Sequence, residues 1–319
     1  MFFHGKALLF VDGLIRLHYN IINRILSKGG EGLTIQVGVT GWGDHDKLYP
    51  DTKTRQQKLK TYATHFDVVE VDSSFYAIQS VSNYTKWAEE TPDNFSFIIK
   101  AHQDMTGQSR KKMTRAEAAS LFDDFLTSIQ PIIEADKLAA VLFQFPPWFQ
   151  VEKTSIDRLR FIRELMKGLP VAIEFRNQSW YADEYRDRTL HLLRELEFIH
   201  TVCDEPQAGS GSVPAVSAVT NDQLTLVRFH GRNVHGWNQN GREDWRKVRF
   251  LYRYNQAELK EWRDTALKLE HSSARVILLF NNNSGGDASD NAKEMMQLLG
   301  QKLPDPPPEQ LNLFDQEGR

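Results

Sequence analysis

Charged and polar side chains recur where short apolar runs of this chain end, and their types suit acid–base chemistry or the binding of an anion. Glu174 and Arg176 end one such run, and Arg228 and His230 end another. Because side chains alternate in direction along a strand, the members of each pair share one face, opposite their apolar neighbours. Charges inside a fold are costly unless they are paired or functional, so we expect a ligand site here. The full set is Glu70, Asp72, Lys100, His102, Gln144, Glu174, Arg176, Asp204, Arg228, His230, Asn281 and Asn282.

This set allows two kinds of catalysis. In the first, carboxylates and the histidine hold a divalent cation, magnesium or manganese, which lowers the pKa of a bound water while arginines stabilise a phosphoryl group. In the second, no metal takes part, Glu174 or Asp204 is the general base and His230 is the acid. The predicted catalytic residues are Glu70, Glu174, Asp204 and His230, and the predicted metal ligands are these four with Asp72. The predicted substrate-binding residues are Asp72, Lys100, Gln144, Arg176, Trp180, Arg228, Arg232, Asn281 and Asn282. A structural interpretation stands beside both, in which salt bridges only close the fold.

The segments between these residues predict a parallel sheet with crossover helices. Short runs rich in Val, Ile and Phe alternate with longer amphipathic segments, which is typical of strand–helix units. The predicted strands are Ile35 to Thr40, Val68 to Val71, Phe95 to Lys100, Ala139 to Phe143, Val171 to Phe175, Phe198 to Val202, Leu224 to Phe229 and Val276 to Phe280. The clearest predicted helices are Arg115 to Ile129, Ser155 to Lys167, Asp183 to Leu196, Gln256 to His271 and Asp290 to Leu299.

Eight such units in a chain of this length favour a TIM-type (β/α)8 barrel, which keeps its functional residues at the carboxyl-terminal mouth. The stretch from Asp204 to Asp222 is rich in Gly, Ser and Pro, so we expect the sixth helix to be irregular or missing.

Composition excludes several classes of protein. The chain has 319 residues, 25% of them charged, and a net charge of -3, so any contact with nucleic acid must come from a local basic patch. Its one cysteine, Cys203, excludes an internal disulfide framework and a cysteine zinc cluster, and suits a reducing cytoplasm. No apolar run reaches membrane-spanning length, so we expect a cytoplasmic protein without a membrane partner.

Six stretches, in order along the chain, resemble the YecE-like family, also called domain of unknown function 72. They cover nearly everything from Ile35 to about Gly300. The resemblance implies a single TIM-type barrel with its site at the strand ends, and it implies no particular reaction. The stretches are Gly38 to Trp42, Val69 to Tyr76, Gln144 to Pro147, Ile173 to Trp180, Arg228 to Arg232 and Phe280 to Asn283.

The two ends of the chain are expected to lie outside this barrel, which we place at residues 34–300. Residues 1–33 indicate an appended amphipathic leader or a start codon placed too far upstream. Residues 301–319 contain a proline-rich run followed by Gln310-Leu311-Asn312-Leu313-Phe314. This pentapeptide resembles the motif that carries bacterial DNA polymerases and mismatch-repair proteins to the sliding clamp, and the predicted clamp-binding residues are Gln310, Leu311, Leu313 and Phe314. The alternative is a terminus whose apolar side chains dock on the chain's own surface.

Three hypotheses for function follow. The first is a barrel that binds an anionic, phosphate-bearing ligand and processes DNA, by phosphodiester hydrolysis and with recruitment to the sliding clamp. Two basic stretches, 107–115 and 228–253, the second of them interleaved with aromatic residues, favour contact with phosphates and bases, although a solvated surface is the alternative. The second is a metabolic lyase, isomerase or hydrolase acting on a small phosphorylated or carboxylated substrate. The third is a DNA or protein adaptor without catalysis.

Overall fold

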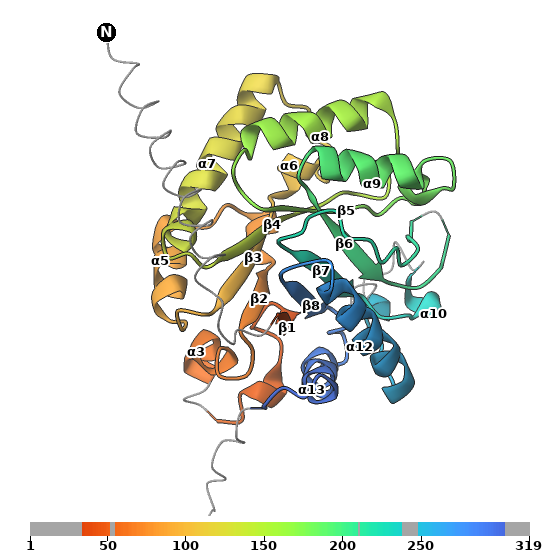
Figure 1. Ribbon diagram of the computed structural model, residues 1–319. Helices are drawn as coiled ribbons and strands as arrows, with labels where there is room; N and C mark the ends of the chain where they lie inside the picture. Colours follow the sequence, from red (N-terminus) through yellow and green to blue (C-terminus); the bar gives the residue numbers. More distant parts are fainter. Residues whose placement is uncertain (1–33, 52–54, 210, 238–247, 304–319) are drawn as a thin grey trace, which may run out of the picture.

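The fold is a closed barrel of eight parallel strands, as the sequence predicts (Figure 1). The computed structural model describes residues 34–303, apart from 52–54, 210 and 238–247. Neighbouring strands pair in chain order, and β1 pairs with β8 to close the sheet. The strands are β1 (Ile35–Thr40), β2 (Val68–Val71), β3 (Ser96–Lys100), β4 (Leu138–Gln144), β5 (Val171–Glu174), β6 (Ile199–Asp204), β7 (Thr225–Phe229) and β8 (Val276–Phe280).

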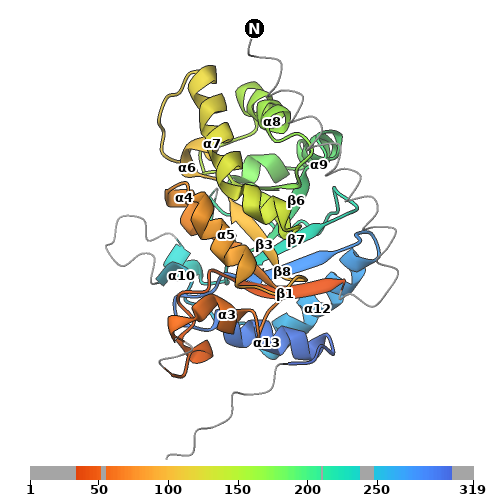
Figure 2. The same ribbon diagram turned by 90° about the vertical axis from the view of Figure 1, so that its left-hand side faces the viewer.

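Helices surround the barrel and cover the outer faces of its strands. Figure 2 shows α5 and α7 side by side over β3, and α12 lies beside α13. The α7 helix begins at a capping box in which Thr114 and Glu117 satisfy each other's backbone amides. The described helices are α3 (Lys58–Tyr62), α4 (Ser73–Tyr76), α5 (Val81–Glu89), α6 (Gln103–Thr106), α7 (Arg115–Glu134), α8 (Lys153–Leu165), α9 (Arg186–Glu195), α10 (Val234–Trp237), α12 (Gln256–Glu270) and α13 (Ala288–Leu298), with 3-10 helices at Asp46–Leu48 and Gln178–Tyr181.

The sixth connection has no helix among its described residues. The chain from 205 to 224, of which residue 210 is not described, runs from β6 to β7 as loop and turns. The prediction of an irregular sixth helix is therefore confirmed.

Two apolar layers explain why the strands are hydrophobic on both faces. Outward side chains such as Val141 and Ile173 pack under the helices. Inward side chains form a smaller cluster that fills the lower part of the barrel, and its members include Val68, Ile98, Leu142, Ala172, Ile199, Leu226 and Leu279. The polar strand-end residues stand above this cluster. The fold therefore supplies an apolar floor beneath them.

Tyr62 joins β1 to the first residue of β2, next to the point where the two strands begin to pair. Its buried hydroxyl accepts from Val39 N at 3.0 Å and donates to Val68 O at 2.8 Å. We expect Tyr62→Phe to lower the free energy of unfolding by about 1–3 kcal/mol, because it leaves both backbone groups buried without a partner. Urea denaturation checks this. Tyr76→Phe, at an exposed position, should change the value by less than about 0.5 kcal/mol, and an equal change in both variants would contradict the account.

His200 on β6 is a buried ring whose protonation opposes folding. Tyr181 Oη lies 2.9 Å from its Nε2, and Ala218 O lies 3.2 Å from its Nδ1. Burial lowers the pKa of His200 from 6.5 to about 4. The unfolded chain therefore binds more protons than the folded one between pH 4 and 6.5, and stability falls as the pH is lowered through this window.

This linkage predicts a measurable difference between two variants. When the pH is lowered from 7 to 4, the wild type should lose about 2–3 kcal/mol more of its unfolding free energy than His200→Gln does. Glutamine keeps one donor and one acceptor but takes up no proton. His191→Gln, at an exposed position, serves as the control. The expectation fails if both variants follow the wild-type pH profile in chemical denaturation.

In the part of the chain that the structure describes, we find no helix that is both long enough and apolar enough to cross a membrane. Residues 1–33 and 304–319 lie outside the described residues, and so does the clamp-like motif.

Candidate functional site

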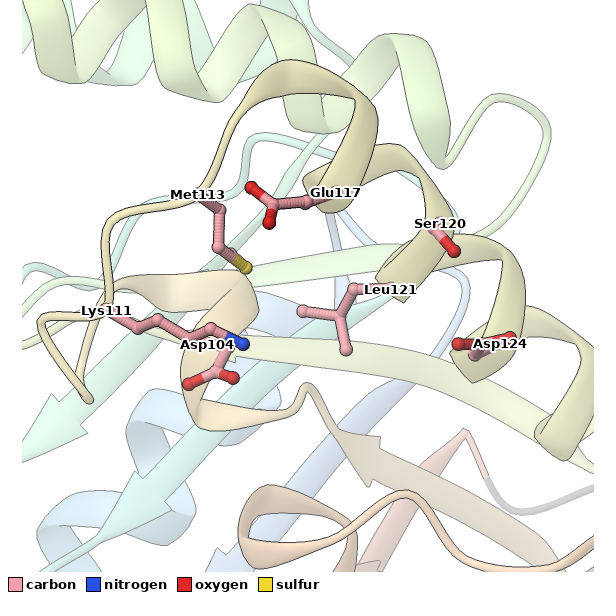
Figure 3. A pocket seen from close by; sticks show the side chains of 7 residues that line it. All are labelled: Asp104, Lys111, Met113, Glu117, Ser120, Leu121 and Asp124. Carbon is pink, nitrogen blue, oxygen red and sulfur yellow. The ribbon is translucent and has the colours of Figure 1, made fainter.

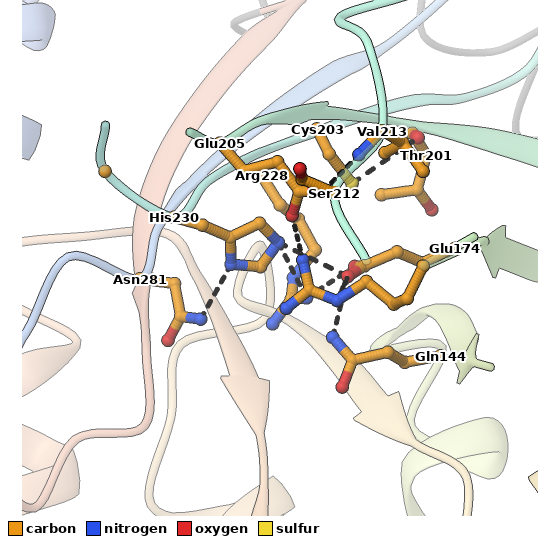
Figure 4. Close-up of polar contacts among 12 residues, drawn as sticks. Gln144, Glu174, Thr201, Cys203, Glu205, Ser212, Val213, Arg228, His230 and Asn281 are labelled. Atoms are coloured by element: carbon orange, nitrogen blue, oxygen red, sulfur yellow. Dashed lines mark hydrogen bonds and ion pairs between the residues drawn. The ribbon is translucent and has the colours of Figure 1, made fainter. Parts of the chain in front are cut away.

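The carboxylate of Glu174 lies at the centre of a buried cluster at the carboxyl ends of the strands (Figure 4). Its Oε1 accepts from Gln144 Nε2 at 2.7 Å and lies 3.3 Å from His230 Nε2 and 3.4 Å from Arg176 Nε. Its Oε2 lies 2.5 Å from Arg228 Nη1. Side chains from β4, β5 and β7 thus meet on one carboxylate. The strand alternation of Glu174 with Arg176, and of Arg228 with His230, points all four inward as the sequence predicts.

Arg228 bridges two carboxylates in the same cluster. Its guanidinium forms a bidentate pair with Glu70, with donor–acceptor distances of 2.8 and 2.5 Å, and contacts Glu174 through Nη1. All three side chains are fully buried. A planar guanidinium suits this double contact, whereas the single ammonium of a lysine would not.

Two inward-facing residues of the cluster were missed by the sequence analysis. Glu205 follows β6 directly; it contacts Arg176 Nη1, and its other oxygen accepts from Val213 N at 2.6 Å. Cys203 lies two residues before Glu205, and its sulfur lies within 4.8 Å of a carboxylate oxygen of Glu174 and an imidazole nitrogen of His230. Strand alternation could have predicted both positions, because Ile199 points inward and Cys203 and Glu205 lie on the same face of the strand as Ile199.

The correction concerns Asp204, which was predicted as a catalytic residue beside Glu174. Its carboxylate lies on the opposite face of β6, where it accepts from Arg232 Nε at 3.0 and 2.9 Å and approaches Tyr254. Arg232 also contacts Glu258, so this pair ties β6 to the start of α12. Strand parity is the physical reason: neighbouring residues of a strand cannot both face the mouth.

Three predicted substrate-binding residues lie away from the cluster, namely Arg232, which pairs with Asp204, and also Trp180 and Asn282. Trp180 is fully buried, stacks on Phe175 with a centroid distance of 4.1 Å and donates to Phe149 O at 2.7 Å. Asn282 is buried and donates to Tyr252 O and Asn291 Oδ1. Both side chains hold loops against the barrel, and their position gives no support to a binding role.

Half-buried groups form the rim above the cluster. Lys100 Nζ lies 3.1 Å from Asp72 Oδ1, and Asn281 Nδ2 lies 3.0 Å from His230 Nδ1. His102, by contrast, caps α6 by accepting from Asp104 N. Lys100, Asp72, Gln144 and Asn281 are all partly exposed, so a ligand can reach the donors and acceptors of the rim before it meets the buried charges below.

The chain after β7 folds over one side of this rim. The indole of Trp237, on α10, is buried; Arg176 lies 5.2 Å from its centroid and Arg249 lies 4.0 Å from it. Phe250 packs edge-on against the same indole and lies 6.1 Å from the ring of His230. An aromatic wall therefore limits water beside His230 and holds two cations by cation–π contact.

Burial and neighbouring charges perturb the ionisation of the cluster. Burial would raise the pKa of Glu174, but Arg228, His230 and Arg176 hold it well below its ordinary value. Burial, opposed by Arg228, raises the pKa of Glu70 to about 7. Burial, opposed by Arg176, raises the pKa of Glu205 to about 7. Burial and then Arg176 lower the pKa of His230 to about 3, so the ring is neutral at neutral pH.

The predicted set of metal ligands is not brought together, because Asp204 faces away and Glu70 is paired with Arg228. Among the described residues, Glu174, Cys203 and His230 are the group whose ligand atoms converge, and all three are buried. This set combines oxygen, sulfur and nitrogen, which differs from the oxygen ligands that magnesium prefers.

A separate pocket lies on the outer surface of the barrel, between α6 and the start of α7 (Figure 3). Its volume is about 210 Å³, and it is lined by Asp104, Lys111, Met113, Glu117, Ser120, Leu121 and Asp124. Carboxylates outnumber the one lysine there, and no lining residue belongs to the Glu174 cluster. The candidate site is therefore the set of strand ends, where groups with strongly perturbed pKa values converge.

A closed parallel (β/α)8 barrel with ionisable groups gathered at its carboxyl-terminal mouth defines this molecule as a TIM-type barrel protein with a candidate mouth site. The sequence profile of the family described as "Protein of unknown function DUF72" matches residues 36–312. The chain belongs to this family, as the resemblance in its six motifs indicates.

Relatives and solved structures agree with this membership. The chain is 48% identical over 281 residues to the UPF0759 protein YunF of Bacillus subtilis (strain 168), which covers 88% of this chain and 100% of that protein. It is 25% identical over 157 residues to the UPF0759 protein YecE of Escherichia coli (strain K12), and the match covers 49% of this chain and 54% of that protein. The crystal structure of a DUF72 family protein from Enterococcus faecalis V583 matches with a TM-score of 0.79 and 37% identity, covering 87% of this chain and 100% of that one. The crystal structure of a DUF72 family protein from Thermotoga maritima MSB8 matches with a TM-score of 0.72 and 27% identity, and the match covers 84% of this chain and 100% of that one.

Proposed function

We propose that this protein is an enzyme that binds an anionic group of a small substrate at the barrel mouth and performs general acid–base chemistry there. The observation that carries the proposal is the buried carboxylate of Glu174, on which Gln144, Arg176, Arg228 and His230 converge. In TIM-type barrels this end of the strands holds the active site.

The purely structural interpretation explains this cluster less well. A salt bridge that only closes a barrel needs one cation for each anion, and it gains nothing from carboxylates whose pKa is raised. Here Glu70 and Glu205 both have pKa values near 7, and His230 is buried beside two guanidiniums. Strongly shifted pKa values of buried groups are typical of functional sites, which often lower the stability of the fold.

The geometry assigns a role to each group. His230, expected from the sequence to be the acid, is assigned here as the base, because Glu174 accepts from its Nε2–H and so leaves Nδ1 as the nitrogen without a proton. Nδ1 faces Asn281 on the rim and reaches a substrate proton once the amide moves aside. Lys100, partly exposed, and Arg176, against Trp237, provide positive charge for a phosphate or carboxylate. The aromatic wall beside His230 favours a small substrate.

A binding screen tests the proposal. Thermal unfolding of the purified protein is followed with a panel of phosphorylated and carboxylated metabolites, and a true ligand at about 100 times its Kd should stabilise the fold by about 2.7 kcal/mol. Lys100→Ala should weaken that ligand by about 10-fold or more. Lys60→Ala, an exposed lysine on α3, should bind as the wild type does. Equal binding by both variants, or no ligand from either class, contradicts the proposal.

A second candidate function is the processing of DNA at the sliding clamp, by hydrolysis of a phosphodiester or as an adaptor without catalysis. Two observations favour it. One is the sequence Gln310-Leu311-Asn312-Leu313-Phe314, and the other is the pair of exposed aromatic side chains of Tyr76, on α4 after β2, and Trp148, on the loop after β4. Arg110 stacks on Trp148 at 4.3 Å, so a cation accompanies this aromatic face.

Titration against the sliding clamp of the same organism tests this candidate. The intact protein should bind, and the double variant Leu313→Ala with Phe314→Ala should not, because both side chains are expected to fill the clamp's apolar pocket. If the intact protein does not bind, clamp recruitment is excluded. Nuclease assays with Glu174→Gln as the control follow only if binding is found.

A further inference from the structure

Two guanidinium groups lie against one indole at the side of the mouth that the chain after β7 covers. The guanidinium carbon of Arg176 lies 5.2 Å from the ring centroid of Trp237, and that of Arg249 lies 4.0 Å from it. The two carbons are therefore at most about 9 Å apart, within reach of a single phosphate group. Because like charges repel, two cations brought this close favour an anion between them.

We propose that Arg176 and Arg249 hold the phosphate group of a phosphorylated substrate beside Trp237. The inference deepens the proposed function by naming the substrate class, a phosphate ester and not a carboxylate, and in this respect it rests on that function. The two oxygens of a carboxylate lie in one plane and are satisfied by one guanidinium. The three terminal oxygens of a phosphate point in different directions and can accept from both.

Arg176 is held in place and still has donors to offer. Its Nε lies 3.4 Å from Glu174 Oε1, and its Nη1 contacts Glu205, whose other oxygen accepts from Val213 N. Two carboxylates from β5 and the end of β6 thus fix the plane of the guanidinium. Its Nη2 makes no hydrogen bond with any residue that the structure describes, so two N–H groups remain for a ligand. An anion therefore meets a donor group that is already oriented.

Arg249 supplies the second guanidinium from the chain that follows α10. Its side chain is half-buried, so a ligand in the mouth can reach it. Burial and then the charge of Arg176 lower the pKa of Arg249 to about 10, so it stays cationic at neutral pH. Glu205 and Glu174 offset part of the repulsion between the two arginines, and a bound phosphate removes more of it.

The charges around this position do not repel an anion. Among the described residues, three guanidiniums and three carboxylates meet here, and the pair of Lys100 with Asp72 adds no net charge. Burial raises the pKa values of Glu70 and Glu205 to about 7, so protonation of either leaves an excess of positive charge. The six groups are Arg176, Arg228, Arg249, Glu70, Glu174 and Glu205.

The phosphate position lies close to the proposed base. The ring centroids of His230 and Trp237 are 6.4 Å apart, and Phe250 packs beside both rings. A small molecule whose phosphate lies against Trp237 can therefore place the rest of its chain at His230. Binding of the phosphate would then orient the reacting part of the substrate toward the imidazole.

Calorimetric titration of the full-length protein with inorganic phosphate tests the inference, in a chloride buffer free of phosphate and sulfate. Phosphate should bind at least about 10-fold more tightly than acetate at the same ionic strength. Arg249→Gln should weaken phosphate binding at least about 10-fold, because charged hydrogen bonds are lost. Arg249→Lys keeps the charge without the planar fork and should lie between the two. Arg188→Gln, at an exposed position on α9, should bind phosphate as the wild type does.

Tryptophan fluorescence tests where the phosphate binds. We expect phosphate to change the emission of the wild type, because one of its seven tryptophans is Trp237. Trp237→Phe should lose this change, and Trp148→Phe, at an exposed position, should keep it. A change that persists in Trp237→Phe would place the anion elsewhere and overturn the inference.

The outcomes separate this inference from the proposed function. Equal phosphate affinity in Arg249→Gln and Arg188→Gln, or acetate bound as tightly as phosphate, overturns the phosphate site. If Arg249→Gln fails to fold, wild-type affinity in Arg249→Lys overturns it instead. If a carboxylated metabolite nevertheless binds and Lys100→Ala weakens that binding, the proposed function stands without the phosphate site. Phosphate bound through Arg249, with no metabolite of either class bound, supports the site and contradicts the proposed function.

Discussion

Replacing Arg228 with methionine should lower the free energy of unfolding by about 3–5 kcal/mol. The guanidinium is fully buried and contacts Glu70 through two nitrogens and Glu174 through a third contact at 2.5 Å. Methionine fills part of the space but leaves Glu70 without its buried cation and Glu174 with the longer contact to Arg176 alone. Chemical denaturation of the purified variant measures the effect.

Two further variants decide whether this loss comes from unpaired charge. The triple variant Arg228→Met, Glu70→Gln and Glu174→Gln should regain most of the lost stability, because neutral amides can bond to each other without a counter-ion. Arg115→Met, which breaks an exposed pair with Glu164, should cost less than about 1 kcal/mol. A loss in the triple variant as large as in the single one would assign the effect to packing instead.

His230→Gln should reduce turnover by about 100- to 10,000-fold, the range expected when a general base is lost. In the structure the imidazole lies between Glu174 and Asn281, and glutamine can bond to both but cannot take up a proton at neutral pH. Stability should stay the same or rise slightly, since a buried neutral ring beside two guanidiniums contributes little to folding. Steady-state kinetics on the substrate identified by the binding screen measures kcat and KM separately.

The control for this prediction is His191→Gln on the outer surface of α9, which should leave kcat unchanged. A fall in kcat with unchanged KM in His230→Gln agrees with a role in the chemical step. Wild-type kcat in His230→Gln would exclude the histidine as the base, whatever its effect on stability.

The sequence predicted the barrel well because its signal is periodic. The bounds of β1, β2 and β8 match the predicted strands at both ends, and the helix over Gln256 begins at the predicted residue. Apolar runs closed by polar residues mark the strand ends in every unit. The short α3 and α5 helices were not singled out, because the segment before Val68 and the one before Phe95 mix polar residues with few apolar ones.

The site was predicted only in part, and the failures have physical causes. Inward positions of β5 and β7 follow from alternation, and Glu174, Arg176, Arg228 and His230 lie where the pattern places them. For β6, Asp204 was chosen because it is the first acid of the run, but strand parity turns Cys203 and Glu205 inward instead. Which cation meets which carboxylate depends on strands far apart in sequence, so the pairing of Arg228 with Glu70 could not be read from local spacing.

The central claim is that the mouth, and not the outer pocket by Lys111, is the ligand site. A crystal structure of the protein soaked with the most strongly stabilising anionic ligand tests it most directly. The account predicts a ligand within hydrogen-bond distance of Lys100 and Asn281, above Glu174 and His230. A ligand found in the pocket lined by Asp104 and Lys111, with the mouth unchanged, would contradict it.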